Sequence, residues 1–464
     1  MTIAFGETFE RVKECFSEPS IVSELVPQLQ SVTIIRDVNG KIRLFLNLSE
    51  GQKPQEVNTT DLAQLLSQKL GPYYGTDIWL PAGENDAYKA LIDTIEQERV
   101  LASWDDELVL PRWYILERHI AKQAWTDKKV GEPPWKEELV YEKRKPAIVS
   151  FFSFKGGVGR TSTLVATALT LARNGHRVAI VDLDLEAPGL ATIFSPDNSN
   201  NPGVIDYLLE KKIQGNDWKL STHIKNLTEP TLLGDNGESL KLLPAGTVDR
   251  DYLEKLARLD FQNLVDGELR STMGDMLKEL QSAAKPLDFI LMDARAGFHD
   301  IGGLAIANLS HAAVIFGTQS RQSWAGLTHV IRHLASPGVD RRLPLILVHS
   351  MAPALGIPGR EQELAGFREQ AYTIFQDNYY SEDETVPNST NIGEPFTPFV
   401  IPYQENLRGD IALFIRNLMP EESSRLPEES SRLSDLVRTM TNSPYQDIAR
   451  KLCEIFNFNL EKSR

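Results

Sequence analysis

The sequence predicts an α/β fold in which a mostly parallel sheet is flanked by helices, preceded by a small N-terminal α+β domain. Beyond residue 147, nearly continuous apolar, β-branched runs alternate with segments of helical periodicity, which is typical of a parallel sheet covered on both faces. Before residue 126, Asn39-Gly40 separates two apolar runs, which indicates a β-hairpin in a smaller, separate domain.

Composition restricts the class of protein. The chain has 464 residues, of which 41% are hydrophobic and 24% charged, as in a soluble globular protein of two or three domains. The formal charge of −15 argues against a mainly nucleic-acid-binding surface, which needs a concentrated basic face. Two cysteines, Cys15 and Cys453, give no metal-ligand spacing and fit a reducing, cytoplasmic setting. We expect no signal peptide and no transmembrane segment.

The N-terminal domain is expected over residues 1–125. Its predicted elements are helices at 9–16, 59–70 and 87–100 and hairpin strands at 32–35 and 42–46. Five tryptophans lie between residues 79 and 135, and we interpret them as core and interdomain packing, with an exposed partner-binding surface as the alternative. No catalytic constellation occurs in this region.

The rest of the chain is divided by composition. Residues 126–146, rich in Lys, Gly and Pro, are predicted to form a linker, and the larger domain is expected over 147–419. The heptad PEESSRL occurs twice in succession, which predicts a polar spacer at 420–434 before a C-terminal helical segment at 435–464. We expect the terminal helix, from Tyr445, to dock onto the larger domain; a membrane-surface helix is the alternative.

The larger domain has a regular pattern of elements. Right-handed crossovers place the loops that follow parallel strands along one edge of the sheet, where ligands bind. The predicted strands are 147–152, 178–181, 240–243, 289–292, 312–316 and 345–348, and helices between them include 161–174, 267–284 and 322–334.

The segment KGGVGRTS, residues 155–162, lies between the first of these strands and a helix, which is the context of a phosphate-binding loop. Its three glycines allow the backbone to curl so that several N–H groups converge on one point. Together with the positive end of the helix that begins near Arg160, these groups can hold phosphate oxygens. The hydroxyl of Thr161 is positioned to bind Mg²⁺.

Acidic residues close two neighbouring strands. Asp182 and Asp184 follow RVAIV, and Asp293 ends FILMD, so their carboxylates can orient a water molecule or support a metal site. A pair of aspartates that caps a strand end is the alternative interpretation. The N–H of Gly297, in the following loop, can report the presence of a γ-phosphate.

Two further residues beyond this strand have two interpretations each. Arg295 either stabilises transition-state charge or pairs with a nearby carboxylate, and we favour the pairing. His299 either senses the phosphate or is a hydrogen-bonded loop residue, and we favour the loop residue.

Together these motifs resemble the deviant Walker A ATPases, the ParA/MinD group of P-loop proteins, over roughly residues 146–413. KGGVG resembles the signature loop of that family, DLDLEAPGL its first switch, and DARAG its Walker B and second-switch segment; LLPAG and VIPYQ resemble later segments. The resemblance implies ATP and Mg²⁺ as cofactors, with a homodimer formed when ATP binds.

The resemblance also implies a role for each matching residue. Lys155 reaches the nucleotide of the facing subunit, Asp184 activates water, and Arg160 contacts the phosphates. Metal binding is implied for Thr161, Asp182 and Asp293. Nucleotide binding is implied for Gly156, Gly157, Val158, Gly159, Arg160, Thr161, Ser162, Gly297 and Pro402.

The sequence departs from the family pattern at three points. Arg160 replaces the Walker lysine, as in a KGGVGR variant subgroup of bacterial proteins, and its planar, bidentate guanidinium is expected to slow hydrolysis. His349-Ser350 stands where relatives often have an asparagine that reads adenine. The chain has no Cys-x-x-Cys, which disfavours an iron–sulfur carrier.

The function implied by the resemblance is a switch that binds ATP, hydrolyses it slowly and controls a protein partner through the N-terminal domain, in bacterial defence or signalling. The alternatives are an ATP-binding adaptor without hydrolysis, and an ATPase that positions DNA or membranes. The acidic balance of the chain counts against the last of these.

Overall fold

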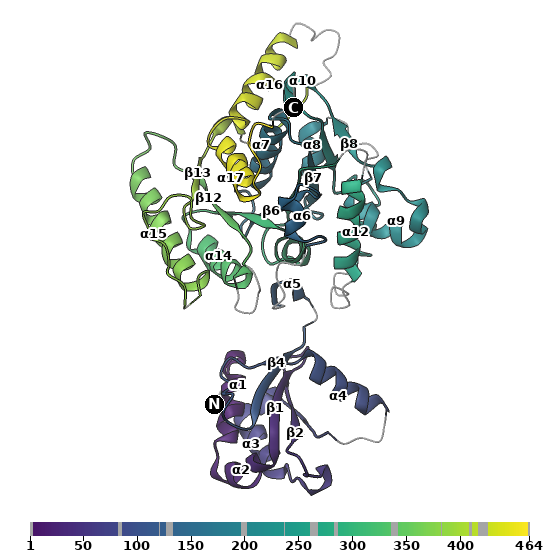
Figure 1. The fold of residues 1–464 in the computed structure, drawn as a ribbon, viewed down its shortest axis with the longest axis vertical. Coiled ribbons are helices and arrows are strands. Elements are labelled where there is room, and N and C mark those ends of the chain that lie inside the picture. The colour runs from purple at the N-terminus through teal and green to yellow at the C-terminus, as the bar shows by residue number, and fades with distance from the viewer. Residues whose placement is uncertain are drawn as a thin grey trace. The chain divides into compact units, whose positions relative to one another are not determined.

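The computed structural model describes residues 3–81, 86–119, 121–126, 133–195, 202–235, 237–259, 268–282, 286–335, 342–381, 383–407, 411–415 and 426–462. Contacts divide the chain into two compact units, Met1–Ile120 and Ala121–Arg464 (Figure 1). Each unit has a sheet and a hydrophobic core of its own.

Unit 1 is a five-stranded mixed sheet with helices on both faces. The predicted hairpin is confirmed: β1 and β2 pair antiparallel around Gly40, whose φ of +79° suits the turn. The strand order is β3-β2-β1-β5-β4, with bounds Leu29–Arg36 (β1), Ile42–Leu48 (β2), Tyr74–Trp79 (β3), Val100–Leu101 (β4) and Arg112–Glu117 (β5). The helices are Thr8–Phe16 (α1), Pro19–Glu24 (α2), Thr60–Leu70 (α3) and Asp86–Glu98 (α4).

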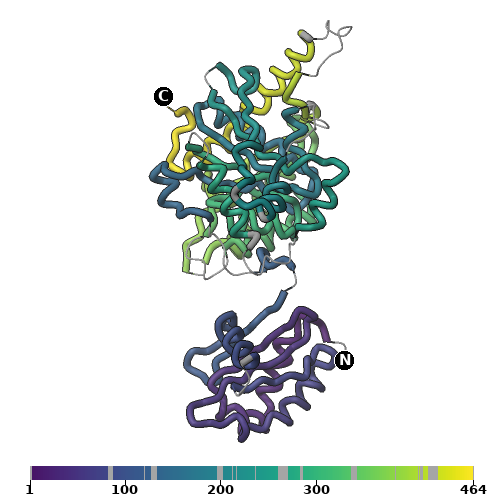
Figure 2. Tube along the Cα trace, turned by 90° about the vertical axis from the view of Figure 1, so that its right-hand side faces the viewer, coloured from purple at the N-terminus to yellow at the C-terminus, as the bar shows by residue number. Residues whose placement is uncertain are grey.

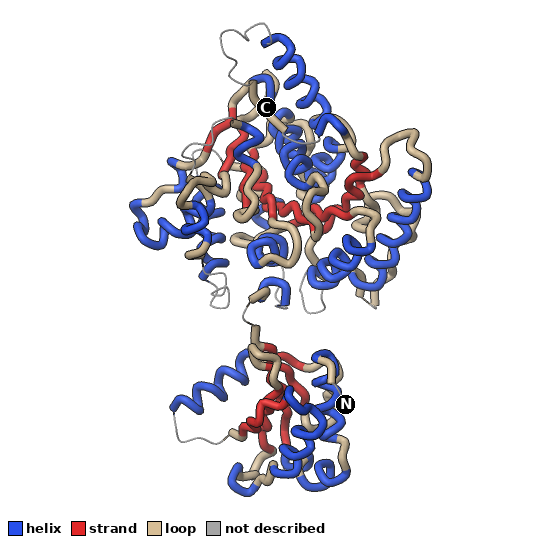
Figure 3. The backbone as a smooth tube through the Cα atoms, turned by 180° about the vertical axis from the view of Figure 1, so that it is seen from behind, coloured by secondary structure: helices blue, strands red, loops and turns tan. Residues whose placement is uncertain are grey.

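Unit 2 contains the predicted parallel sheet, drawn in red between helices in Figure 3. All of its strand pairs are parallel except the β8–β9 pair at one edge. The order is β13-β12-β11-β6-β10-β7-β9-β8, and the strands are Ala147–Ser153 (β6), Val178–Leu183 (β7), Lys225–Leu227 (β8), Leu240–Leu243 (β9), Phe289–Ala294 (β10), Ala312–Gly317 (β11), Leu345–Ala352 (β12) and Phe399–Pro402 (β13). The six strands predicted from sequence are confirmed.

Helices cover the sheet of unit 2. They are Gln123–Thr126 (α5), Glu137–Tyr141 (α6), Arg160–Arg173 (α7), Leu190–Phe194 (α8), Val204–Gln214 (α9), Pro230–Leu233 (α10), Tyr252–Leu256 (α11), Glu268–Ser282 (α12), Asp300–Gly303 (α13), Arg321–Leu334 (α14), Arg360–Asn378 (α15), Leu426–Met440 (α16) and Tyr445–Ile455 (α17). No helix of the described ranges is both long and apolar enough to cross a bilayer.

The sheet order determines where the site lies. β6 pairs with β10 and β11, and β10 pairs with β7, so the loops after β6, β7 and β10 leave one edge of the sheet side by side. Asp293 on β10 stands in register with Asp182 on β7 and with Phe151 on β6. The glycine-rich loop and the acidic strand ends are therefore neighbours, as crossover geometry predicts.

The predicted linker differs from the structure. Residues 127–132 lie outside the described ranges, but residues 133–146 pack on unit 2. Trp135 is buried and its indole N–H donates to the carbonyl oxygen of Pro146 at 2.8 Å, while Val140 of α6 is fully buried. Trp125, predicted to be a packing residue, is also buried in the core of unit 2. The polar composition of this segment gave no indication that these side chains are buried.

The predicted spacer differs as well. Most of the first PEESSRL copy lies outside the described ranges, but the second copy, Pro427–Leu433, belongs to helix α16. Leu433, Leu436, Val437 and Met440 are buried at helical spacing, and α16 contacts α7 and α10. This apolar stripe begins in the last residue of the repeat, so the repeat forms the exposed start of a packed helix.

The C-terminal helix docks as predicted. Ile448, Leu452 and Phe456 of this segment are fully buried, and α17 contacts α7 and β13. Figure 2 shows the yellow C-terminal segment running along unit 2. Because the apolar face of α17 is buried, it does not provide the exposed face that a membrane-surface helix needs.

Candidate nucleotide-binding site

The glycine-rich loop connects β6 to α7 through a left-handed backbone. Gly157 and Gly159 have φ values of +73° and +77°, which glycine adopts without the steric penalty of a side chain. A Cβ atom at Gly156 or Gly157 would meet no atom within 4 Å. The loop is therefore open on the side where a ligand would approach.

The main-chain N–H groups of this loop are available to a ligand. Within the described part of the chain, those of residues 156–162 donate no hydrogen bond to protein, whereas the next one, of Thr163, bonds the carbonyl oxygen of Gly159 at 3.0 Å. The loop also lines a cavity of about 780 Å³, a volume within the range of small-molecule sites. Free N–H donors at a helix N-terminus form an anion-binding site.

Thr161 and Asp293 form the link expected of a metal site. The hydroxyl of Thr161 donates to Oδ2 of Asp293 at 2.6 Å. Among the described residues, no cluster of three or more His, Cys, Asp or Glu side chains is arranged to hold a metal alone. Mg²⁺, however, needs only one or two protein ligands when phosphate oxygens and waters supply the rest.

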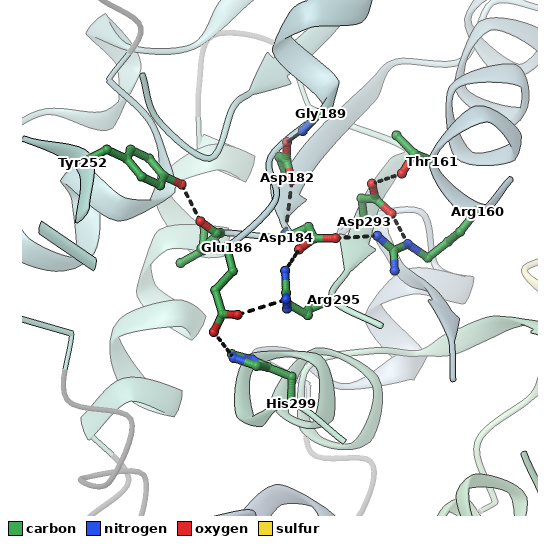
Figure 4. Close-up of polar contacts among 11 residues, drawn as sticks. Arg160, Thr161, Asp182, Asp184, Glu186, Gly189, Tyr252, Asp293, Arg295 and His299 are labelled. Atoms are coloured by element: carbon green, nitrogen blue, oxygen red, sulfur yellow. Dashed lines mark hydrogen bonds and ion pairs between the residues drawn. The ribbon is translucent and has the colours of Figure 1, made fainter. Parts of the chain in front are cut away.

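Arg160 contacts carboxylates, although the sequence placed it on phosphates. Its Nε donates to Oδ1 of Asp293 at 2.5 Å and its Nη2 to Oδ2 of Asp184 at 3.0 Å, and the side chain is 8% exposed (Figure 4). Burial lowers the pKa of Arg160, but the two carboxylates outweigh this effect and raise it. The guanidinium therefore stays charged and ties α7 to two strand ends.

A chain of ion pairs continues from Asp184. The other oxygen of Asp184 accepts from Arg295 at 2.7 Å, Arg295 also reaches Glu186 at 2.9 Å, and Glu186 pairs with His299 at 2.6 Å (Figure 4). We call residues 184–189 the first switch loop and residues 295–300 the second switch loop. The chain joins the two loops, and it confirms the carboxylate pairing that we favoured for Arg295.

Asp182 holds the first switch loop through hydrogen bonds to its main chain. It is fully buried, and its carboxylate accepts main-chain N–H groups of Asp184, Gly189 and Leu190 at 3.0–3.1 Å. Burial and the neighbouring Asp293 raise the pKa of Asp182 to about 7. Neither Asp182 nor Asp293 lines the cavity, and the contacts of Asp182 are those of an anchor for the first switch loop.

Burial also raises the pKa of Asp293, against the opposing effects of Arg160 and Thr161. Both carboxylate oxygens of Asp293 accept hydrogen bonds from these two side chains. This arrangement suits the ionised form, which can support a cation held by Thr161.

Part of the cavity lining is mostly apolar. Pro402 lines the cavity, together with Ile401, Tyr403 and Gln404 of the VIPYQ segment and with three residues that sequence reasoning missed: Met351, Leu407 and Tyr445. Tyr445 comes from α17, which the sequence placed in a separate segment. Only its position as the first residue of a docking helix could have indicated it.

Lys155, Gly297 and His349 lie outside the cavity lining, as Asp182 and Asp293 do. Lys155 is exposed and, among the described residues, has no ion-pair or hydrogen-bond partner. Gly297 donates its N–H to the carbonyl oxygen of Ser153 at 3.1 Å, so in this structure it is not free to contact a phosphate. His349 is buried and stacks on Phe367 with ring centroids 3.9 Å apart.

Ser350 does line the cavity, but its hydroxyl is engaged by the loop. It donates to the carbonyl oxygen of Val158 and so fixes the loop to the end of β12. Neither residue of the His349-Ser350 pair is therefore a free reader of a base.

Comparisons with known proteins agree with this geometry. Residues 145–212 match the family model described as ParA: NUBPL iron-transfer P-loop NTPase. That segment is a ParA-family P-loop NTPase. It contains the glycine-rich loop, α7, β7 and the first switch loop.

Two curated relatives extend the similarity. The chloroplastic Fe-S cluster assembly factor HCF101 of Oryza sativa subsp. japonica is 31% identical over 153 residues, which are 30% of this chain and 28% of HCF101. The putative septum site-determining protein MinD of Chlorella vulgaris is 25% identical over 262 residues, 53% of this chain and 76% of that protein. The match with HCF101 thus spans less than a third of that relative.

A solved structure also aligns with part of this chain. The MinD cell division protein of Aquifex aeolicus has a TM-score of 0.39 and 17% identity, and covers 68% of this chain and 98% of that one.

HCF101 is named as an Fe–S cluster assembly factor, but the residues described here include no set of ligands for such a cluster. Clusters are held by accessible cysteine thiolates. Cys15 and Cys453 are both buried and lie in different units. Burial raises the pKa of the Cys15 thiol to about 11 and that of the Cys453 thiol to about 12.

Proposed function

We propose that this chain is a slow ATP-dependent switch that binds ATP with Mg²⁺, pairs with a second copy of itself and controls a protein partner. The observation that carries this proposal is the row of free main-chain N–H groups at residues 156–162, which faces a cavity of about 780 Å³. The residues present fit a magnesium-bound nucleoside triphosphate, because they offer N–H donors to phosphate and oxygen ligands to Mg²⁺.

The residues of the site have separate roles in this proposal. The loop N–H groups hold the phosphates, and Thr161, oriented by Asp293, offers its hydroxyl oxygen to Mg²⁺. The metal, when bound, neutralises charge on the phosphate oxygens. Asp184 lines the cavity, which supports a role for its carboxylate in orienting an attacking water.

Slow hydrolysis follows from the ion pairs of Asp184. Its two oxygens are engaged by the guanidinium groups of Arg160 and Arg295. A carboxylate paired with two guanidinium groups is a weaker base toward water, because the two positive charges stabilise its ionised form. A rearrangement of the switch loops that frees one of these pairs would therefore speed hydrolysis, so that the ion pairs set the rate of the switch.

Lys155 supports the pairing of two copies. Its ammonium group is exposed, lies outside the cavity lining of its own chain and has no partner among the described residues. It is therefore available to the phosphates of a second copy. A protein partner would then recognise the ATP-bound pair, with unit 1 as the proposed partner-binding module.

Mass measurement in solution tests the proposal. With ATP and Mg²⁺ the full chain should form a dimer, and Lys155→Ala should bind ATP but stay monomeric. Lys143→Ala, another lysine before β6, is the matched control and should dimerise. A wild-type protein that stays monomeric at saturating ATP would remove the dimer, and a protein without phosphate release would be a non-hydrolysing adaptor.

A further inference from the structure

The cavity receives a polar group from the C-terminal helix. Tyr445, the first residue of α17, lines the cavity and is 3% exposed. Among the described residues its hydroxyl has no hydrogen-bond partner, and the hydroxyl oxygen is not fully enclosed by protein atoms. Burial raises the pKa of Tyr445 to about 12, so the hydroxyl is protonated at neutral pH and can both donate and accept.

Gln404 is a second polar group of the same kind. It follows β13 and lines the cavity, and its carboxamide has no partner within the described ranges. Helix α17 contacts β13, so the elements that carry Tyr445 and Gln404 pack together. The surrounding walls are apolar side chains, among them Met351, Ile401 and Leu407. Apolar walls with a few polar groups suit a flat heterocyclic base.

His349 and Ser350, which stand where relatives often have an adenine-reading asparagine, are held by other contacts. His349 is buried against Phe367, and Ser350 donates to the loop carbonyl of Val158. The unpartnered amide of Gln404 and the unpartnered hydroxyl of Tyr445 line the same cavity as the phosphate loop.

We propose that Tyr445 and Gln404 are the residues that bind the nucleoside part of the ligand, so that α17 completes the nucleotide site. This inference rests on the proposed function and adds its specificity-determining residues. It also gives α17 a second role: a helix docked on α7 contributes a group to the ligand that the N-terminus of α7 holds.

The test separates the base from the phosphates. Calorimetric titration of the full chain with ATP and with inorganic tripolyphosphate compares wild type with Tyr445→Phe, which removes one oxygen atom. We expect ATP binding to weaken about 3- to 10-fold, the range for one hydrogen bond, with tripolyphosphate binding unchanged. Tyr380→Phe is the control, because its hydroxyl is also unpartnered but Tyr380 does not line the cavity.

Two results would overturn the inference: unchanged ATP affinity in Tyr445→Phe, or equal weakening for ATP and tripolyphosphate. A wild type that binds neither compound would instead remove the proposed function, on which the inference rests.

The segment that follows unit 1 in sequence is hydrogen-bonded to the second switch loop. The main-chain N–H of Lys122 donates to Oδ1 of Asp300 at 2.6 Å and its ammonium group to Oδ2 at 2.9 Å. The indole N–H of Trp125 donates to the carbonyl oxygen of His299 at 2.8 Å. Residues 122–126, which we call the strap, are thus bonded to the end of the second switch loop.

The strap is also packed there. The ring of Trp125 lies between those of Phe152 and Phe298, each with centroids 5.3 Å away. A Cβ atom at Gly303 of α13 would approach the indole to 2.6 Å, so the contact depends on glycine. Trp125 is 4% exposed, which makes the strap part of the core beneath the second switch loop.

From the strap, a series of ion pairs leads to the site. His299 pairs with Glu186, Glu186 with Arg295, and Arg295 with Asp184, which lines the cavity (Figure 4). We infer that the strap is coupled to the nucleotide site, so that nucleotide binding changes the strap and a change in the strap alters nucleotide affinity. Such coupling is reciprocal for binding free energies.

Trp125→Phe and Trp135→Phe provide a matched pair. Each loses one 2.8 Å indole–carbonyl hydrogen bond from a buried ring of unit 2, but only Trp125 contacts the second switch loop. In the full chain, Trp125→Phe should shift the ATP–Mg²⁺ dissociation constant about 3-fold or more, within the range of one hydrogen bond, and Trp135→Phe should not.

Hydrogen exchange of the wild type gives a second measurement. ATP–Mg²⁺ should change exchange at the amides of residues 122–126, which do not line the cavity. Equal affinities for the two variants, or equal shifts, together with unchanged exchange in the strap, would overturn the coupling.

Discussion

Arg160 and Asp293 form a buried ion pair, with 2.5 Å between Nε and Oδ1, and the same guanidinium reaches Asp184 at 3.0 Å. A lysine ammonium is a single point charge and cannot make this forked contact in the same geometry. Replacement of the Walker lysine by arginine therefore changes what the residue can hold, and several predictions depend on it.

Arg160→Lys should release phosphate from ATP roughly 10-fold faster than wild type, because Asp184 loses one of its two guanidinium partners and becomes free to orient water. Single-turnover phosphate release measures this. Arg173→Lys, at the far end of α7, is the control and should match wild type. A slower rate in Arg160→Lys would mean that the arginine itself promotes hydrolysis.

Arg160→Met should destabilise unit 2 by about 3–5 kcal/mol, because the buried carboxylates of Asp293 and Asp184 lose their shared cation. Denaturant unfolding without nucleotide measures this free energy. Arg173→Met loses only a hydrogen bond to the carbonyl oxygen of Leu232 and should cost far less. Equal losses in the two variants would show that the ion pairs contribute little.

Thr161→Val should make ATP affinity independent of Mg²⁺. Valine has the shape of threonine but no hydroxyl, so the donor to Asp293 and the proposed metal ligand disappear together while the loop N–H groups remain. Titrations with ATP in Mg²⁺ and in EDTA measure the difference. Thr167→Val, also on α7 but outside the cavity lining, is the control. A Thr161→Val protein that still binds ATP more tightly with Mg²⁺ would move the metal ligand elsewhere.

His311 should make stability fall in acid. Burial lowers its pKa to about 4, and its Nδ1 accepts the N–H of Ile148 at 3.1 Å, which requires a neutral ring. Between pH 6.5 and about pH 4, His311 is protonated in the unfolded chain but neutral in the folded chain. The stabilisation is therefore complete above pH 6.5 and lost as pH falls through 4, by about 3 kcal/mol in total.

Denaturant unfolding at pH 7 and pH 4.5 measures the effect of His311. His311→Asn should be less stable at pH 7 but lose less stability on acidification than wild type. Identical losses in the two proteins would assign the acid sensitivity to other groups, such as His349, whose pKa burial also lowers to about 4.

Much of the site was predictable because it depends on local pattern. The strand–loop–helix around residues 155–162 and the acidic strand ends are short motifs, and parallel topology brings them to one edge. The contact of Arg160 was not predictable, since it depends on the register that sets Asp293 beside Asp182. Sequence reports the charge of a side chain but not which of several neighbours it reaches.

Contacts between distant segments also escaped sequence reasoning. Tyr445 lies far along the chain from the glycine-rich loop, and only the docking of α17 on α7 brings it to the cavity. Trp135 and Leu433 lie in polar stretches, so composition predicted a linker and a spacer where single buried anchors fix the backbone.

Calorimetry of ATP–Mg²⁺ binding tests most directly whether the main-chain N–H groups of the glycine-rich loop bind a triphosphate. Gly157 and Gly356 both have positive φ and open space for a Cβ atom, but only Gly157 lines the proposed site. Wild type and Gly356→Val should bind one ATP per chain, and Gly157→Val should bind at least about 10-fold more weakly, because valine is strained at positive φ. Equal binding by all three proteins, or no binding by wild type, would contradict the account.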